Sequence, residues 1–205
     1  IHRVFWACHR MKIPHHRRST FPSATEDEAR AKKVPDTAQT RSSAYGLAYS
    51  DLDFMKREEL RPVRLQLELM KAEVMLQEHG VEATVVIFGS ARSKPGALAP
   101  DDPRCADYAA ARRLGQLISS SDNGCPECLR VVTGGGPGIM EAGNRGADDV
   151  GAESIGLNII LPHEQAPNPY ITPELCFQFH YFALRKMHFL MRARALVCFP
   201  GGFGT

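Results

Sequence analysis

The chain has 205 residues, and 43% of them are hydrophobic, which is enough for one ordinary domain with its own core. Basic and acidic residues nearly balance, with a formal net charge of +2, so composition does not indicate a surface for nucleic acid. No apolar run approaches the roughly 18 residues of a membrane-spanning helix. Six cysteines in mostly apolar surroundings are typical of a reduced, cytoplasmic protein without disulfides.

Residues 1–43 differ in composition from the rest of the chain. Arg, Lys and His crowd the first 18 residues, which hold no Asp or Glu, and the next 25 show no apolar periodicity. We therefore expect residues 1–43 to be a mostly disordered tail. An organelle transit peptide has a similar composition, but paired histidines and two prolines would interrupt its amphipathic helix. Because the first residue is Ile1, we expect either a fragment or a translation start at Met11.

Residues 44–80 are expected to form a helical extension. Apolar residues there follow the 3-4-3-4 spacing of one helix face, at Leu60, Val63, Leu67, Met70 and Val74. Gly80 is a suitable stop for this helix. We expect the apolar stripe to pack on the chain's own domain; a surface for a partner protein is the alternative.

Strands and helices are expected to alternate over residues 81–205. Apolar runs predict strands, and 3.6-residue periods predict the helices between them. The expected strands are 83–88, 129–133, 154–161, 175–179 and 195–199, and the expected helices are 108–118, 139–149 and 181–194. This order predicts an α/β fold: an open parallel, Rossmann-like, doubly wound sheet with helices on both faces. Ligands of such sheets bind at the carboxyl ends of the strands.

The loop after the second expected strand has four glycines in the five residues Gly134 to Gly138 and enters a helix. Glycine allows close approach of an anion, and a helix N-terminus offers unpaired N–H groups. The dinucleotide fingerprint would place its third glycine at Ile139, and no Gly-Lys-Ser/Thr of a Walker A loop follows. We therefore expect Gly135, Gly136 and Gly138 to contact a phosphate or ribose; a tight turn without a ligand is the alternative.

A second glycine-rich loop, residues 200–205, follows the last expected strand. Backbone N–H groups and a hydroxyl can hold a phosphate in such a loop. The expected phosphate ligands are Gly201, Gly202, Gly204 and Thr205. Ser90, in the loop after the first expected strand, is expected to support them.

Three motifs in this order, residues 134–140, Arg185 to Met187 and residues 200–205, resemble the LONELY GUY family, long mislabelled "lysine decarboxylase". The resemblance runs from about residue 83 to Thr205. The segment 140–144 and the helical extension look closer to longer bacterial members labelled AMP nucleosidase. The resemblance implies hydrolysis of the N-glycosidic bond of a nucleoside 5'-monophosphate, AMP or a cytokinin ribotide, to free base and ribose 5-phosphate. It also implies a homodimer.

Glycosidic cleavage needs a phosphate anchor, a donor toward the departing base and a carboxylate. Arg185 matches the family's catalytic arginine, and because a guanidinium keeps its proton, its expected role is hydrogen bonding and charge stabilisation. Lys186 would stand beside it as a substrate contact. A solvated basic helix face is the alternative for this pair, although apolar residues at 187, 190 and 191 predict an amphipathic helix. The family's catalytic glutamate would fall three residues beyond Thr205, so the chain as given is expected to be C-terminally truncated and inactive.

The remaining candidate groups give weaker indications. Glu141 and Glu164 are expected to cap a helix or to bind substrate hydroxyls, with Glu164 a candidate substrate contact. Cys125 and Cys128 have zinc spacing but no second pair, so no metal is expected. No cofactor is expected either, because nothing indicates a pyridoxal phosphate pocket around Lys186. Two functions stay open: the nucleotide glycosidase, and a non-catalytic nucleotide-binding or carrier module.

Overall fold

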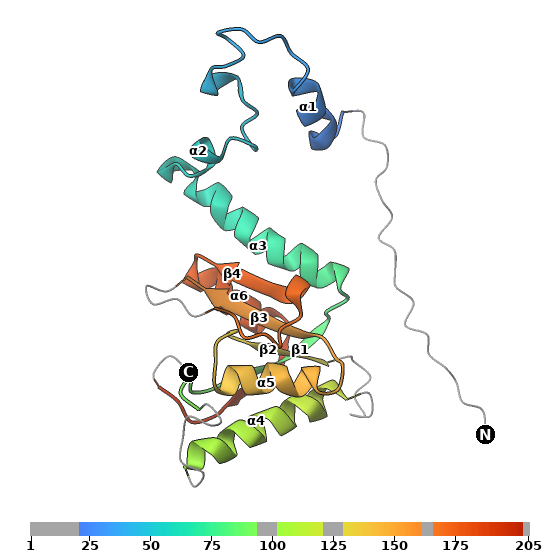
Figure 1. Cartoon of the computed structure of the whole chain (residues 1–205), viewed down its shortest axis with the longest axis vertical. Helices are drawn as coiled ribbons and strands as arrows, with labels where there is room; N and C mark the ends of the chain where they lie inside the picture. The colour runs from blue at the N-terminus through green and yellow to red at the C-terminus, as the bar shows by residue number, and fades with distance from the viewer. Residues whose placement is uncertain (1–20, 94–101, 121–128, 161–165, 203–205) are drawn as a thin grey trace, which may run out of the picture. The chain divides into compact units, whose positions relative to one another are not determined.

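The computed structural model describes residues 21–93, 102–120, 129–160 and 166–202 (Figure 1). The chain divides into two compact units, Ile1–Arg64 and Leu65–Thr205. The sequence placed the start of the sheet domain at residue 81, whereas the second unit already begins within a long helix. The last part of the expected helical extension therefore belongs to the sheet unit.

The second unit is built on a five-stranded sheet with the order β4-β3-β2-β1-β5, in which all neighbours are parallel. The strands are β1 (Ala83–Phe88), β2 (Leu129–Thr133), β3 (Ser154–Ile159), β4 (Cys176–Phe179) and β5 (Ala193–Cys198). The first two have the predicted bounds, and the others differ at their ends. The prediction of an α/β fold with an open parallel sheet is confirmed.

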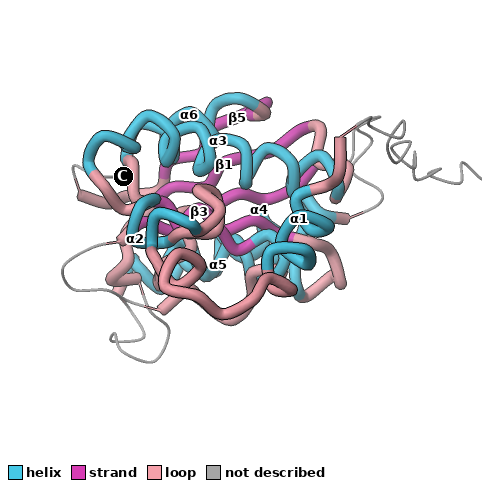
Figure 2. The backbone as a smooth tube through the Cα atoms, turned by 90° about the horizontal axis from the view of Figure 1, so that it is seen from above, coloured by secondary structure: helices cyan, strands magenta, loops and turns pink. Residues whose placement is uncertain are grey.

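Helices cover both faces of this sheet (Figures 1 and 2). On one face lie α3 (Arg61–Glu78), from Leu65 onward, and α6 (Phe182–Met191), packed on an apolar cluster that includes Val86, Leu157 and Phe179. On the other face α4 (Pro103–Ser119) and α5 (Ile139–Asp148) cover a cluster that includes Ile87 and Val131. A short 3-10 helix, Pro173–Leu175, precedes β4. The doubly wound arrangement expected from the sequence is therefore present.

Two carboxylates of α3 hold the two ends of α6. The helix α6 has no capping side chain of its own, and Glu68 instead accepts the backbone N–H groups of His180 and Tyr181 at 3.0 and 2.9 Å. At the other end, the Arg192 guanidinium donates to both carboxylate oxygens of Glu73, at 2.9 and 2.7 Å. Orphan N–H groups at a helix start need such an acceptor. The position of α6 therefore depends on α3.

The apolar stripe of α3 that the sequence predicted to pack on the chain's own domain faces outward instead, and α6 carries exposed apolar residues as well. On α3, Leu67, Met70 and Val74 are exposed, while the buried residues are Ala72 and Leu76. On α6, the exposed apolar residues include Phe182, Met187, Leu190 and Met191, and the buried residues are His188 and Phe189. Both helices carry apolar residues on more than one face, so the 3.6-residue period could not identify which face packs.

The first unit contains short helices and no buried residue between positions 21 and 64. Its elements are α1 (Ala24–Ala31), a 3-10 helix at Ser43–Tyr45, α2 (Leu52–Met55) and a second 3-10 helix at Glu58–Leu60. The expected disordered tail thus contains a helix that the sequence analysis missed. Its signal is a capping box, because Ser23 Oγ accepts the Glu26 N–H at 3.2 Å and the Glu26 carboxylate accepts the Ser23 N–H at 2.8 Å.

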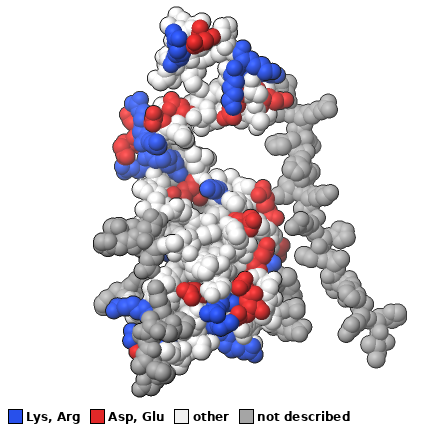
Figure 3. Space-filling view, viewed as in Figure 1, with Lys and Arg blue, Asp and Glu red and all other residues white. Residues whose placement is uncertain are grey.

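The surface carries charges of both signs. Basic and acidic side chains are interleaved on the face shown in Figure 3, as the balanced composition suggests. Among the helices that the structure describes, none is both long and apolar enough to cross a membrane.

Candidate functional site

The loops after β1, β2 and β5 meet at the carboxyl edge of the sheet, and Ser90 joins them. Its N–H donates to the carbonyl of Pro200 at 3.2 Å, and its own carbonyl accepts the N–H of Ile139 at 3.0 Å. The Ser90 hydroxyl accepts the N–H of Arg92 at 3.1 Å, which closes the loop after β1. The structure thus brings together three of the predicted site segments: Ser90, the loop ending at Gly138, and the loop that begins at Pro200.

Glycine is required at two positions of the loop after β2 by the protein's own packing. Gly135 has φ +77°, and a Cβ there would lie 2.1 Å from Asn158 Oδ1. Gly138 has φ +72°, and its Cβ would lie 2.3 Å from the carbonyl oxygen of Ser90. Both conformations are disfavoured for residues with a side chain. Two of the four glycines are therefore required by the turn itself, which agrees in part with the alternative of a tight turn without a ligand.

Two N–H groups of this loop have partners inside the protein. The Gly135 N–H donates to Thr133 Oγ1 at 3.0 Å, and the Ile139 N–H at the start of α5 donates to Ser90. From the sequence, the start of this helix was expected to offer unpaired donors. The structure corrects that expectation for Ile139, because the loop after β1 reaches over the helix start.

Arg185 extends from α6 toward the same edge. Its Nε donates to the carbonyl of Leu157 at 2.6 Å, and its Nη2 lies 3.4 Å from the carbonyl of Gly134. The guanidinium carbon is 5.2 Å from the centre of the Phe189 ring, close enough for a cation–π contact. Burial lowers the pKa of Arg185, since removal from water disfavours the charged form. Within the described ranges no carboxylate pairs with this half-buried cation.

The other predicted site residues are placed differently. Lys186 is exposed, with its Nζ 4.9 Å from the centre of the Phe182 ring on its own helix. Glu141 accepts the hydroxyl of Tyr108 at 3.0 Å and so faces α4. Gly201 and Gly202, in the loop that begins at Pro200 and reaches the site, are exposed. The predictions for Glu164, Gly204, Thr205, Cys125 and Cys128 lie outside the described residues.

Four polar residues behind the loop after β2 were missed by the sequence analysis. Thr133, Asn144 and Ser154 are fully buried, and Asn168 is nearly so. Asparagine is rarely buried unless its side chain is hydrogen-bonded. Asn144 interrupts the small apolar face of a helix that begins directly at the loop, and this position could have identified the buried polar residues from the sequence.

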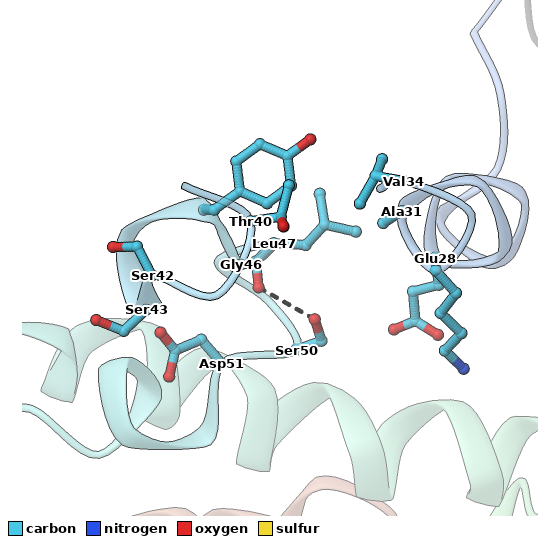
Figure 4. A pocket seen from close by; sticks show the side chains of 12 residues that line it. Glu28, Ala31, Val34, Thr40, Ser42, Ser43, Gly46, Leu47, Ser50 and Asp51 are labelled. Atoms are coloured by element: carbon cyan, nitrogen blue, oxygen red, sulfur yellow. Dashed lines mark hydrogen bonds between the residues drawn. The ribbon is translucent and has the colours of Figure 1, made fainter. Parts of the chain in front are cut away.

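The first unit contains a hollow of about 560 Å³, formed by α1 and the loop that leads to α2. Figure 4 shows its lining, where the Ser50 hydroxyl donates to the carbonyl of Leu47 at 3.1 Å. No predicted site residue lines this hollow. Among the described residues no group of three or more His, Cys, Asp and Glu side chains is placed to hold a metal ion.

The chain resembles one protein family and several solved structures. The family described as "Possible lysine decarboxylase" matches residues 140–205. No curated protein matches the chain. Among solved structures, the X-ray structure of TM1055, a structural genomics target, is 25% identical, with a TM-score of 0.40. That match covers 58% of this chain and 61% of the other. Over the segment that carries Arg185 and the loop after β5, the chain is therefore similar to the family described as "Possible lysine decarboxylase".

Proposed function

We propose that the protein binds a nucleoside 5'-monophosphate at the carboxyl edge of the sheet and hydrolyses its N-glycosidic bond. The products would be a free base and ribose 5-phosphate. The observation that carries this proposal is the guanidinium of Arg185, which is half-buried and contacts backbone carbonyls and aromatic rings.

A partly desolvated cation without a carboxylate partner favours an anionic ligand. Its charge has been taken from water, so a negative group placed beside it is stabilised more than on the surface. A nucleotide offers two such groups: the 5'-phosphate, and the purine that gains negative charge as the glycosidic bond breaks. Arg185 would stabilise the departing base by hydrogen bonding, while keeping its own proton.

The phosphate would be held by the loop after β5. Gly201 and Gly202 are exposed at the carboxyl edge, next to Ser90 through the bond from its N–H to Pro200. Backbone N–H groups in such a loop bind anions without a side chain. We include Gly136, Gly138, Lys186, Glu164, Gly204 and Thr205 as substrate contacts of this proposal. A cytoplasmic location is part of it as well.

The competing function is a non-catalytic nucleotide-binding or carrier module. It needs the same anion site but no carboxylate for the attacking water. The resemblance to the LONELY GUY family supports the enzyme, since it implies a catalytic glutamate at the position three residues after Thr205. Base release from AMP and from isopentenyladenosine monophosphate, measured by chromatography on protein that includes this position, separates the two. Binding with release supports the hydrolase; binding without release supports the module.

We also propose that the protein is a homodimer whose contact is the outward apolar surface of α3 and α6. That surface consists of Leu67, Met70, Val74, Met187, Leu190 and Met191, all exposed. A two-fold contact can cover the same patch on both subunits. Leu190→Glu should convert a dimer to a monomer in sedimentation, whereas Leu117→Glu, at an exposed leucine of α4, should not. A monomeric wild-type protein would contradict this proposal.

A further inference from the structure

A cluster of four buried polar side chains lies directly behind the glycine loop after β2. Thr133 ends β2, Asn144 lies on α5, Ser154 begins β3, and Asn168 lies on the segment before β4. The first three are 0% exposed and Asn168 is 7% exposed. Burying polar groups is unfavourable unless they are paired, so a cluster of this kind is retained only where every member has partners.

Asn144 is the centre of the cluster. Its Oδ1 accepts the Thr133 hydroxyl at 2.6 Å and Asn168 Nδ2 at 3.0 Å. Its Nδ2 donates to the Ser154 hydroxyl at 3.0 Å. Asn144 therefore ties the end of one strand, the start of the next strand and a distant loop to a single helix.

The cluster also holds both polar backbone groups of Gly135. Thr133 Oγ1 accepts the Gly135 N–H, and the Gly135 carbonyl accepts the backbone N–H of Asn168 at 2.9 Å and its Nδ2 at 3.2 Å. Asn168 Nδ2 is also 3.1 Å from the carbonyl oxygen of Gly136. With these groups fixed, the neighbouring Gly134 carbonyl faces Arg185 Nη2.

We propose that Thr133, Asn144 and Asn168 are positioning residues that hold the glycine loop in its ligand-binding conformation before the nucleotide arrives. They act through the loop backbone, fixing the Gly134 carbonyl against Arg185, and do not touch the ligand. A glycine-rich loop otherwise loses much conformational freedom on binding, and prior ordering removes that unfavourable entropy. That the ordered loop binds a nucleotide rests on the proposed function. That the cluster orders the loop concerns the free protein alone.

Thr133→Val, Thr133→Ser and Thr84→Val form a matched set of variants. Valine keeps the shape of threonine but removes the hydroxyl that serves both Gly135 and Asn144, and serine keeps that hydroxyl. Thr84 is a buried threonine of β1 whose hydroxyl has no hydrogen-bond partner among the described residues, so Thr84→Val removes a buried hydroxyl away from the loop. Thermal unfolding of each variant confirms that it is folded. If Thr133→Val does not fold, Asn168→Ala takes its place, because residue 168 lies on a loop rather than in the sheet.

Hydrogen exchange of the free protein tests the ordering. We expect amide exchange over residues 134–136 to be at least about tenfold faster in Thr133→Val than in wild type, and unchanged in Thr133→Ser and Thr84→Val. Equal exchange in all four proteins would overturn the proposal, whatever the protein binds.

Calorimetric titration with AMP tests the consequence for binding. We expect Thr133→Val to weaken affinity by about 10- to 100-fold, a loss typical of misplaced binding groups, and Thr133→Ser to restore it. Unchanged AMP affinity in Thr133→Val would overturn the positioning role even if exchange is faster. A wild-type protein that binds no nucleotide would overturn the proposed function, and the exchange experiment would then still decide whether the cluster orders the loop.

Discussion

The two units of the chain are stabilised in different ways. The sheet unit has an apolar cluster on each face of its sheet, and its largest buried side chains include Phe179, Ile87 and Leu157. The first unit buries no residue between positions 21 and 64, and short-range contacts such as the capping box of α1 maintain its helices. Helices without a packed face are marginal in water. A substitution in the first unit should therefore destabilise only the helix that carries it, whereas a substitution in the core of the sheet unit should destabilise that whole unit.

The largest effect is expected from a cavity in the sheet unit. Phe179→Ala removes a ring that is 1% exposed, and should lower the free energy of unfolding by about 3–5 kcal/mol. Phe54→Ala, at a 38% exposed ring of α2, should cost less than ~1 kcal/mol. Urea denaturation followed by circular dichroism measures both. Equal losses of unfolding free energy in the two variants would contradict the difference between the units, because they would show that Phe54 is packed as tightly as Phe179.

A smaller effect is expected where α3 caps α6. Glu68→Ala leaves the N–H groups of His180 and Tyr181 without their acceptor, and should cost about 0.5–2 kcal/mol in urea denaturation. Because α6 carries Arg185, the same variant should bind AMP more weakly. Glu78→Ala, at an exposed glutamate near the end of α3, is the control and should change neither quantity. If Glu68→Ala changed neither the stability nor the AMP affinity, α3 would not be needed to position the site.

His188 should make the stability of the sheet unit depend on pH. Burial lowers the pKa of His188 in the folded state, an effect that the nearby Glu73 carboxylate opposes. As the pH falls below about 6.5, the unfolded chain takes up a proton before the folded one does, so stability present above that pH is lost. The slope should not exceed ~1.4 kcal/mol per pH unit for this one group. His188→Gln should flatten the dependence of the urea midpoint on pH between pH 7 and 5, and His180→Gln, at an exposed histidine, is the control.

The smallest effect is expected in the first unit. Ser23→Ala removes the hydroxyl that caps α1, and should cost ~1 kcal/mol or less, confined to that helix. Hydrogen exchange of the α1 amides should rise, while the urea midpoint of the sheet unit stays constant. Thr25→Ala, in the first turn of the same helix, serves as the control. A shift of the urea midpoint by Ser23→Ala would mean that the two units unfold together.

The sequence predicted the sheet because buried parallel strands are continuous apolar runs, as at 83–88 and 129–133. It also predicted that the loops after these strands would meet, which follows from parallel order alone. It could not identify which face of α3 or α6 packs, since Leu67 and Leu76 are equally apolar. Nor could it show that Ser90 occupies the start of α5, or that Asn168 reaches Gly135, because both are contacts between segments far apart in the chain. The helix α1 was missed because only its cap, and no apolar face, marks it.

The most direct test of the proposed site is the AMP affinity of Arg185→Leu against that of wild type. The variant removes the half-buried charge while keeping an apolar side chain beside Phe189. Calorimetry should show at least about a tenfold loss of affinity, as for removal of a charge-assisted hydrogen bond to an anion. Arg113→Leu, at an exposed arginine of α4, should stay within about threefold of wild type. Equal affinities of the Arg185→Leu and wild-type proteins for AMP would contradict the account.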